Sequence, residues 1–225
     1  MKFRFNRIGG FEIFREDLVI EANRRLCAIL SGLIMRLNFL EDKMPATKVA
    51  QEIEGLYKII PLKVLRRTPG VNFDCLEKKE LPRVDAFDRV IHTTGAISPG
   101  PVGEVQRPWY MHPYQADNLM VLHGERHVEI YTKKFGRVLK VDVTPDRIVI
   151  DGELAYDGAA MLVWPCYVFH RIRSCEVKGS ASVNFAVHTE GFDLKTNFNI
   201  YDLNTETGEY RVVRAGHLDQ PNAGE

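Results

Sequence analysis

The most informative parts of the sequence are Arg107-Pro108-Trp109-Tyr110-Met111-His112-Pro113-Tyr114-Gln115-Ala116-Asp117 and Gly158-Ala159-Ala160-Met161-Leu162-Val163-Trp164-Pro165-Cys166-Tyr167-Val168-Phe169-His170. Both stretches join aromatic and apolar residues, which favour β-strands, to histidine or acidic side chains that bind metals or move protons. Gly124 follows the first stretch after six residues, and residues 125–157 separate it from the second. The pattern indicates strands that carry chemically active side chains.

This pair of stretches resembles the two sequence motifs of the cupin family. The first cupin motif is H-x-H, a short gap, a glutamate, six residues and a glycine. Here His112 stands at the second histidine, followed by a proline as in germin-like members, and Asp117 and Gly124 stand at the acidic and glycine positions. Tyr110 replaces the first histidine, and Asp117 has a shorter side chain than the glutamate of the motif. The resemblance therefore implies a site in which two of the four usual ligand positions differ.

The second motif matches at Gly158, Pro165 and His170, whereas Tyr167 replaces a glycine and Ser174 replaces the final asparagine. The resemblance covers about residues 89–214. It implies a mainly β fold, the cupin-type double-stranded β-helix or jelly-roll barrel, to which the helical pattern of the first residues adds an N-terminal α-helical segment. We expect the barrel in residues 71–225 and the helical segment in residues 1–70.

The hydrophobic pattern also favours β-structure from about residue 89. Short runs rich in β-branched and aromatic residues alternate there with turn residues. The expected strands are 89–94, 119–122, 127–132, 137–143, 148–150, 160–164, 181–188, 197–202 and 210–214. Residues 66–88, which mix charges with two prolines, are expected to connect the helical and β parts.

The N-terminal segment has a helical pattern. Apolar residues recur at steps of three and four between Asp17 and Leu40, which predicts an amphipathic helix. A second helix is predicted from Ala46 to Ile59, ended by Pro61. The apolar stripe of the first helix is wide and needs a partner, so we expect it to pack across the barrel or to form a homodimer contact.

The residues His112, Asp117 and His170 form a candidate metal site. Two imidazoles and a carboxylate can hold divalent Fe, Mn, Ni or Zn with positions left open for substrate or oxygen. A separation of five along a straight strand sends His112 and Asp117 to opposite faces, so the chain has to bend between them. Pro113 is the candidate cause of that bend.

A second enzymatic interpretation needs no metal. As the resemblance implies, isomerases and epimerases of nucleotide-linked sugars share this barrel and use a histidine base with a tyrosine acid. His112 with Tyr110 is the candidate catalytic pair, with Tyr114 as the alternative acid. The candidate substrate-binding residues are Gln115, Arg107, Tyr114 and His188. Residues able to bind a phosphate or carboxylate bidentately are Arg107, Arg126, Arg171 and Arg173.

A non-catalytic interpretation is a ligand sensor whose N-terminal helices contact DNA or another protein. The chain carries 30 basic and 30 acidic residues, while residues 1–70 carry 13 basic and 8 acidic ones, a net charge of +5. This is modest for DNA binding, and no glycine stands where a helix-turn-helix usually has one. We therefore expect a small-molecule ligand and no nucleic acid.

Localisation is inferred from what the sequence lacks. The longest uncharged apolar stretch, residues 26–35, is too short to span a membrane, and the N-terminus lacks a secretory signal. We therefore expect a cytoplasmic protein that does not contact a membrane. The sparse cysteines, which we expect to be reduced, are Cys27, Cys75, Cys166 and Cys175. Phosphate-loop, dinucleotide-binding and hydrolase motifs are absent, which disfavours nucleotide hydrolysis and Rossmann-type dehydrogenase chemistry.

Overall fold

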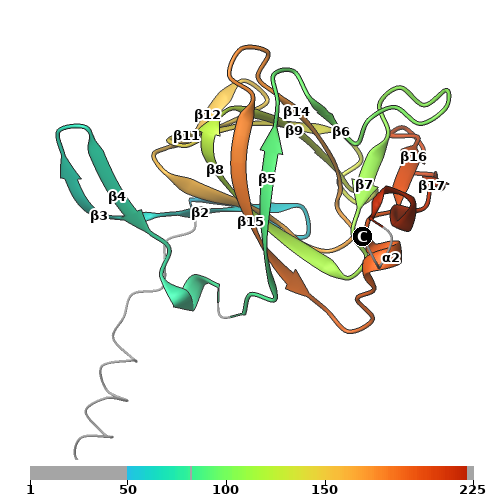
Figure 1. Ribbon diagram of the computed structural model, residues 1–225, viewed down its shortest axis with the longest axis horizontal. Coiled ribbons are helices and arrows are strands. Elements are labelled where there is room, and N and C mark those ends of the chain that lie inside the picture. The colour runs from blue at the N-terminus through green and yellow to red at the C-terminus, as the bar shows by residue number, and fades with distance from the viewer. Residues whose placement is uncertain (1–49, 82, 222–225) are drawn as a thin grey trace, which may run out of the picture. The chain divides into compact units, whose positions relative to one another are not determined.

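The computed structural model describes residues 50–81 and 83–221. Contacts divide the chain into residues 1–46 and 47–225, and every described residue belongs to the second unit. The helix predicted between Asp17 and Leu40 lies outside the described residues, as does Cys27. The described unit is built mainly of antiparallel strands (Figure 1).

One sheet contains six antiparallel strands. In spatial order they are β1 (Gln51–Ile53), β2 (Tyr57–Pro61), β13 (Ala160–Trp164), β8 (Gln115–Gly124), β15 (Ser180–His188) and β5 (Ala86–His92). The central strand β8 thus pairs with two strands that lie far from it in the sequence. This places Asp117 of β8 directly opposite Trp164 of β13.

The other large sheet contains nine strands. In spatial order they are β12 (Glu153–Asp157), β11 (Arg147–Ile150), β10 (Leu139–Thr144), β9 (Arg126–Tyr131), β14 (Phe169–Ser174), β7 (Trp109–Met111), β16 (Ile200–Leu203) and β17 (Tyr210–Arg214), with β6 (Ile97–Ser98) also paired to β14. His170 of β14 lies opposite Tyr110 of β7 and opposite Ile130 of β9.

The inner faces of the two sheets bury a shared apolar core. Leu119 and Leu162 from the first sheet and Val128 and Val141 from the second are all at most 3% exposed. Burial alternates along β9 and β10, as a strand with one face on a core requires. The strand order confirms the predicted fold class, a mainly β double-stranded β-helix or jelly-roll barrel.

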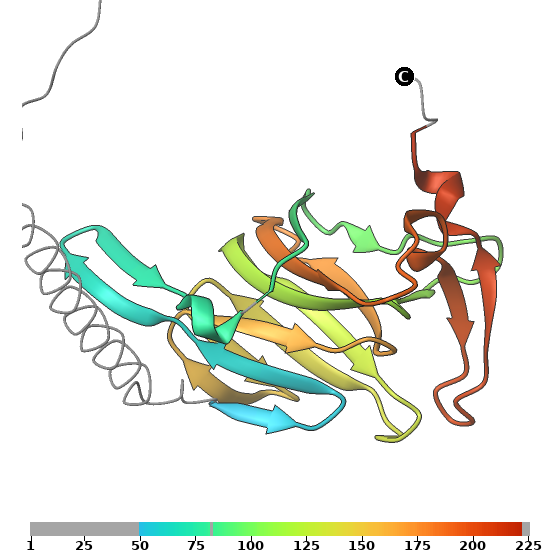
Figure 2. The same ribbon diagram turned by 90° about the horizontal axis from the view of Figure 1, so that it is seen from below.

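Two hairpins lie at opposite ends of the barrel (Figures 1 and 2). One contains β16 and β17, and the other contains β3 (Lys63–Thr68) and β4 (Val71–Cys75), which pair only with each other. The short helices are η1 (Lys78–Glu80), α2 (Leu194–Asn197) and η2 (Gly216–Asp219). Among the described residues, no helix is long and apolar enough to cross a membrane.

The predicted helix from Ala46 to Ile59 is wrong over its described part. Residues 51–53 and 57–61 are strands joined by a turn at Gly55, whose φ is 77°. Tyr57, Ile59 and Ile60 are buried while Lys58 is only partly buried, and the segment forms a strand because it pairs with β1 and β13. Because β2 pairs with β13, the barrel begins before residue 71, within the segment predicted to be helical.

The nine strands predicted beyond residue 89 all occur, and the bounds of β13 and β17 agree with the prediction. The connection predicted for residues 66–88 instead includes β4, η1 and parts of β3 and β5. The sequence analysis also missed β6, β7, β12 and β14. Of these, β7 and β14 matter most, because they position Tyr110 and His170.

Candidate functional site

The candidate site lies where β7, β8 and β14 approach one another inside the barrel. β7 ends at Met111 in one sheet and β8 begins at Gln115 in the other, so the chain bends between His112 and Asp117. The bend expected around Pro113 is therefore present. It brings His112, Asp117 and His170 together, each at most 6% exposed.

The three polar side chains converge through specific atoms. Nε2 of His112 lies 3.6 Å from Oδ2 of Asp117, and Nε2 of His170 lies 3.8 Å from the same oxygen. These separations are too long for hydrogen bonds. The imidazole rings of the two histidines are 4.8 Å apart.

The opposite ring nitrogens of both histidines face main-chain carbonyls. Nδ1 of His112 lies 2.6 Å from the carbonyl oxygen of Asn197, and Nδ1 of His170 lies 3.2 Å from that of Val168. A carbonyl oxygen only accepts hydrogen bonds, so each Nδ1 carries the proton in the neutral ring. Both Nε2 lone pairs are therefore directed to the space beside Asp117.

Asp117 is held by three side-chain donors. Gln115 Nε2 and Asn184 Nδ2 each donate to Oδ1 at 2.7 Å, and Trp164 Nε1 donates to Oδ2 at 3.0 Å. Burial opposes ionisation of this carboxyl, but attraction to the imidazole of His112 or His170 when either is protonated, and the hydrogen bonds from Gln115 and Asn184, outweigh it, so the pKa of Asp117 is lowered. A carboxylate fixed in this way can accept a cation on Oδ2.

The electrostatics keep His170 neutral. Burial, together with the adjacent His112, lowers the pKa of His170 to about 4. Its Nε2 lone pair is therefore available at neutral pH.

Tyr110 lies beside the two histidines. The centre of its ring is 6.1 Å from that of His112 and 6.0 Å from that of His170. Burial raises the pKa of Tyr110, so its phenol keeps its proton at neutral pH. Tyr110 is thus a candidate proton donor next to the histidines.

The histidines and Asp117 line a cavity of about 240 Å³. The sequence-predicted residues Tyr110, His112, Gln115, Asp117 and His170 all line it. Three residues predicted to bind substrate, Arg107, Tyr114 and His188, are not among its lining residues. The ring of His188 instead stacks on Phe192 at 3.6 Å between centres.

Sequence reasoning missed several residues of the site. Trp164 and Phe198 line the cavity, and Asn197 supplies the carbonyl that orients His112. Trp164 lies within the second motif, where its position opposite Asp117 appears only once the strands are paired. Asn184 also lines the cavity, as the alternation along residues 181–188 predicts, because it shares one strand face with Ser182, Ala186 and His188.

Three of the candidate anion-binding arginines are paired with acids outside this cavity. Arg107 and Arg171 pair with Glu129, and Arg173 pairs with Glu176. The guanidinium of Arg171 also lies 4.1 Å from the centre of the Trp109 ring. Arg126 is the exception, since it is 1% exposed and lines the cavity.

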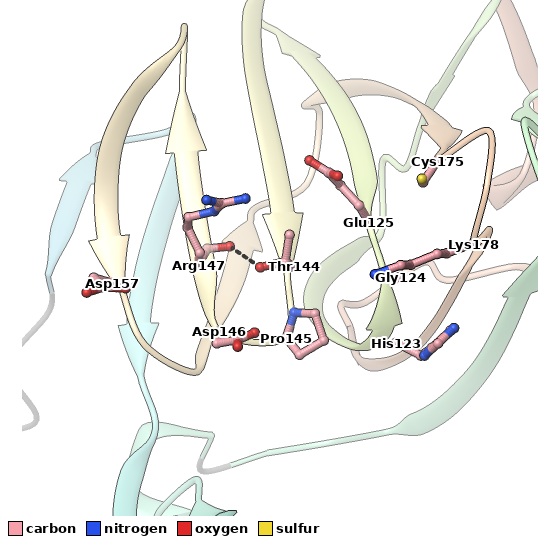
Figure 3. A pocket seen from close by; sticks show the side chains of 10 residues that line it. All are labelled: His123, Gly124, Glu125, Thr144, Pro145, Asp146, Arg147, Asp157, Cys175 and Lys178. Carbon is pink, nitrogen blue, oxygen red and sulfur yellow. Dashed lines mark hydrogen bonds between the residues drawn. The ribbon is translucent and has the colours of Figure 1, made fainter.

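Other hollows offer weaker chemistry. One depression has a volume of about 640 Å³. Figure 3 shows that its His123, Asp146 and Asp157 side chains lie on separate segments and do not converge on one point. A second group of close ligand atoms belongs to Glu125, His127 and Asp142, all partly exposed. There Nδ1 of His127 already bonds Asp142 at 2.7 Å.

No family model and no curated protein matches this chain. Among the solved structures to which it is similar are three described as 3,4-ketoisomerases. The first is QdtA, a sugar 3,4-ketoisomerase from Thermoanaerobacterium thermosaccharolyticum in complex with TDP, with a TM-score of 0.44 and 12% identity over 63% of this chain and 85% of that chain. The second is a 3,4-ketoisomerase from Helicobacter canadensis, with a TM-score of 0.39 and 14% identity over 60% of this chain and 86% of that chain. The third is the WlaRB TDP-quinovose 3,4-ketoisomerase from Campylobacter jejuni, with a TM-score of 0.42 and 15% identity over 63% of this chain and 89% of that chain. At these identities the likeness concerns the fold.

Proposed function

We propose that this protein is a cupin-type metalloenzyme that acts on a small polar substrate. Nε2 of His112, Nε2 of His170 and Oδ2 of Asp117 are the ligands of one divalent transition metal. The observation that carries the proposal is the convergence of both Nε2 atoms on Oδ2 at 3.6 and 3.8 Å, with no hydrogen bond between them.

The donor set fits a metal in geometry. Ligand atoms about 2.1 Å from one ion lie roughly 3.4 Å apart at tetrahedral angles, so only small movements are needed to surround a metal here. The carbonyls behind both Nδ1 atoms and the indole behind Asp117 supply the outer hydrogen bonds that metal ligands usually have. Two imidazoles and a carboxylate suit Fe, Mn, Ni or Zn.

The side chains around the ligands define what each would do in a reaction. A bound divalent ion would act as a Lewis acid toward oxygen atoms of the substrate. Tyr110 keeps its proton at neutral pH, because burial raises its pKa, so its hydroxyl would donate a hydrogen bond to substrate. The rings of Trp164 and Phe198 line the cavity beside the ligands and reduce access of water.

The proposal is tested by elemental analysis of protein purified without chelator or nickel affinity. We expect near-stoichiometric metal in wild type and its loss in His112→Ala and His170→Ala. The matched control is His217→Ala, because His217 is an exposed histidine that belongs to neither group of close ligand atoms. Equal metal content in all four proteins would overturn the proposal.

A metal-free sugar-nucleotide isomerase is the second candidate function. It is favoured by the proximity of Tyr110 and His112 in one cavity, an acid and a base that could exchange protons with a sugar. Turnover of a TDP-linked keto sugar that survives chelation and is lost in Tyr110→Phe would support this candidate over the metalloenzyme. TDP that fails to bind would remove it.

We also propose that the protein is a cytoplasmic homodimer. The dimer contact would bury the apolar stripe of residues 17–40; in the alternative, that segment would pack on the barrel. Light scattering at micromolar concentration distinguishes a dimer from a monomer, and a strict monomer would contradict the dimer. Cell fractionation would test the cytoplasmic location.

A further inference from the structure

A buried cation lies along the cavity from the histidines. Arg126 of β9 is opposite Ser174 of β14, whereas His170 of the same strand is opposite Ile130. Four residues of strand, about 13 Å, therefore separate the backbone positions of His170 and Ser174. Arg126 and His170 both line the cavity, so it has one end at the histidines and another toward Arg126.

Arg126 has no acidic partner within residues 50–81 and 83–221. Its Nε donates to Oγ of Ser180 at 3.1 Å, and its Nη2 donates to the carbonyl oxygen of Val90 at 3.2 Å. Both acceptors are neutral, and these are the two hydrogen bonds that the guanidinium makes among the described residues. Burying a charge without a counter-ion is costly, and burial accordingly lowers the pKa of Arg126 to about 10. An anion in the cavity would offset this cost.

A second unsatisfied group lies near this arginine. Nδ1 of His92, another cavity-lining residue, is buried and has no hydrogen-bond partner. Burial and the charge of Arg126 lower the pKa of His92 to about 4, so this imidazole is neutral at pH 7 and can donate one N–H. Arg126 and His92 together offer more hydrogen-bond donors than the protein itself satisfies.

The wall between the two ends is mixed. Val90, Leu119 and Ile172 supply apolar surface, whereas Asp88 lines the same cavity and its carboxylate accepts a hydrogen bond from Nδ2 of Asn184 at 3.0 Å. The cavity of about 240 Å³ is also smaller than the roughly 300–1,000 Å³ typical of sites for drug-sized ligands. The space suits a short molecule with a polar group at each end and carbon atoms between them.

We propose that Arg126, with His92 beside it, binds a carboxylate group of the substrate, so that the substrate is a small organic acid. A guanidinium binds a carboxylate through paired N–H···O bonds, a geometry that other small groups match less well. The proposal rests on the proposed function only for the other end of the substrate, where a substrate oxygen would bind the metal held by His112, Asp117 and His170. The binding of the carboxylate end is argued from Arg126 and His92 alone.

The experiment is a calorimetric titration with acetate, butyrate and hexanoate, each compared with its uncharged amide. We expect wild type to bind at least one acid about tenfold more tightly than the matching amide, and Arg126→Gln to lose this preference. Arg211→Gln is the control, because Arg211 is exposed and pairs with Asp202 at 2.9 Å on β16. The preference must survive in this control.

If Arg126→Gln does not fold, the same titration is carried out on wild-type protein from which a chelator has removed the metal. A preference for acid over amide that persists without metal supports binding at Arg126, whereas a preference that disappears with the metal places the carboxylate on the metal and overturns the inference. Unchanged preference in folded Arg126→Gln, or no preference in wild type, also overturns it.

Metal analysis of the same samples separates the two proposals. Metal in wild type without any preference for acids removes only the inference about Arg126. Preference for acids in a wild-type protein that holds no metal removes only the metalloenzyme, and leaves the carboxylate site standing.

Discussion

The indole N–H of Trp164 donates to Oδ2 of Asp117 at 3.0 Å, the same oxygen that both histidine Nε2 atoms approach. The two residues are direct neighbours across the β13–β8 pairing, so strand register sets this contact. The hydrogen bond from Trp164 therefore uses one lone pair of Oδ2, and the other lone pair remains available on the side of the histidines. It is a positioning residue for the proposed metal.

Trp164→Phe should weaken metal binding while keeping most of the packing. Loss of an outer hydrogen bond to a metal ligand typically lowers affinity by about 10- to 100-fold. The measurement is competition for the metal with a chelator of known affinity. The matched control is Trp109→Phe, since Trp109 is equally buried but lies in the separate cluster with Met111 and Phe169. Equal affinities in both variants would show that the indole does not position Asp117.

Gly124→Ala should destabilise the barrel far more than Gly70→Ala. Both glycines have left-handed φ values, 71° and 76°, which cost an alanine about 1 kcal/mol each. A Cβ at Gly124 would also collide with the carbonyl of Gly179, while the one at Gly70 would meet open space. Thermal unfolding of both variants measures the difference, and similar melting temperatures would contradict it.

His92 should make the free energy of unfolding depend on pH. Burial and Arg126 lower its pKa to about 4 from the ordinary 6.5, so between these values the unfolded chain binds a proton that the folded chain does not. Its contribution to stability is therefore complete above pH 6.5 and lost as the pH falls toward 4.

Denaturant unfolding across this pH range tests the role of His92. The loss of stability on acidification should be smaller in His92→Gln than in wild type. The control is His217→Gln, because His217 is exposed. A His92→Gln protein with the wild-type pH profile would show that another group is responsible.

The sequence was sufficient for the barrel and for the three polar side chains that meet in the cavity, because both depend on local patterns. Alternating apolar residues predicted the strands beyond residue 89, and motif spacing selected His112, Asp117 and His170, which the fold does bring together. The bend at Pro113 could be argued from the same spacing.

The remaining features depend on contacts that no local pattern encodes. Residues 57–61 carry apolar side chains that suit either a helix or a strand, and pairing with β13 decides for the strand. The sequence does not distinguish the four candidate arginines from one another. In the fold, Arg107, Arg171 and Arg173 form ion pairs with acidic side chains, whereas Arg126 is buried in the cavity. Such differences arise from long-range register, which one sequence does not reveal.

Asn184→Asp should be strongly destabilising although it changes only one side-chain group. Nδ2 of Asn184 donates to Asp117 at 2.7 Å and to Asp88 at 3.0 Å, and its Oδ1 accepts the main-chain N–H of Asn118 at 2.7 Å. A carboxylate keeps the last bond but turns the other two into contacts between like charges in a buried setting. We expect a loss of roughly 2 kcal/mol or more at pH 7, which shrinks on acidification as the carboxyls protonate. Asn72→Asp on exposed β4 is the control. If both variants unfolded at the same denaturant concentration, Asn184 would not be the donor that holds these two carboxylates together.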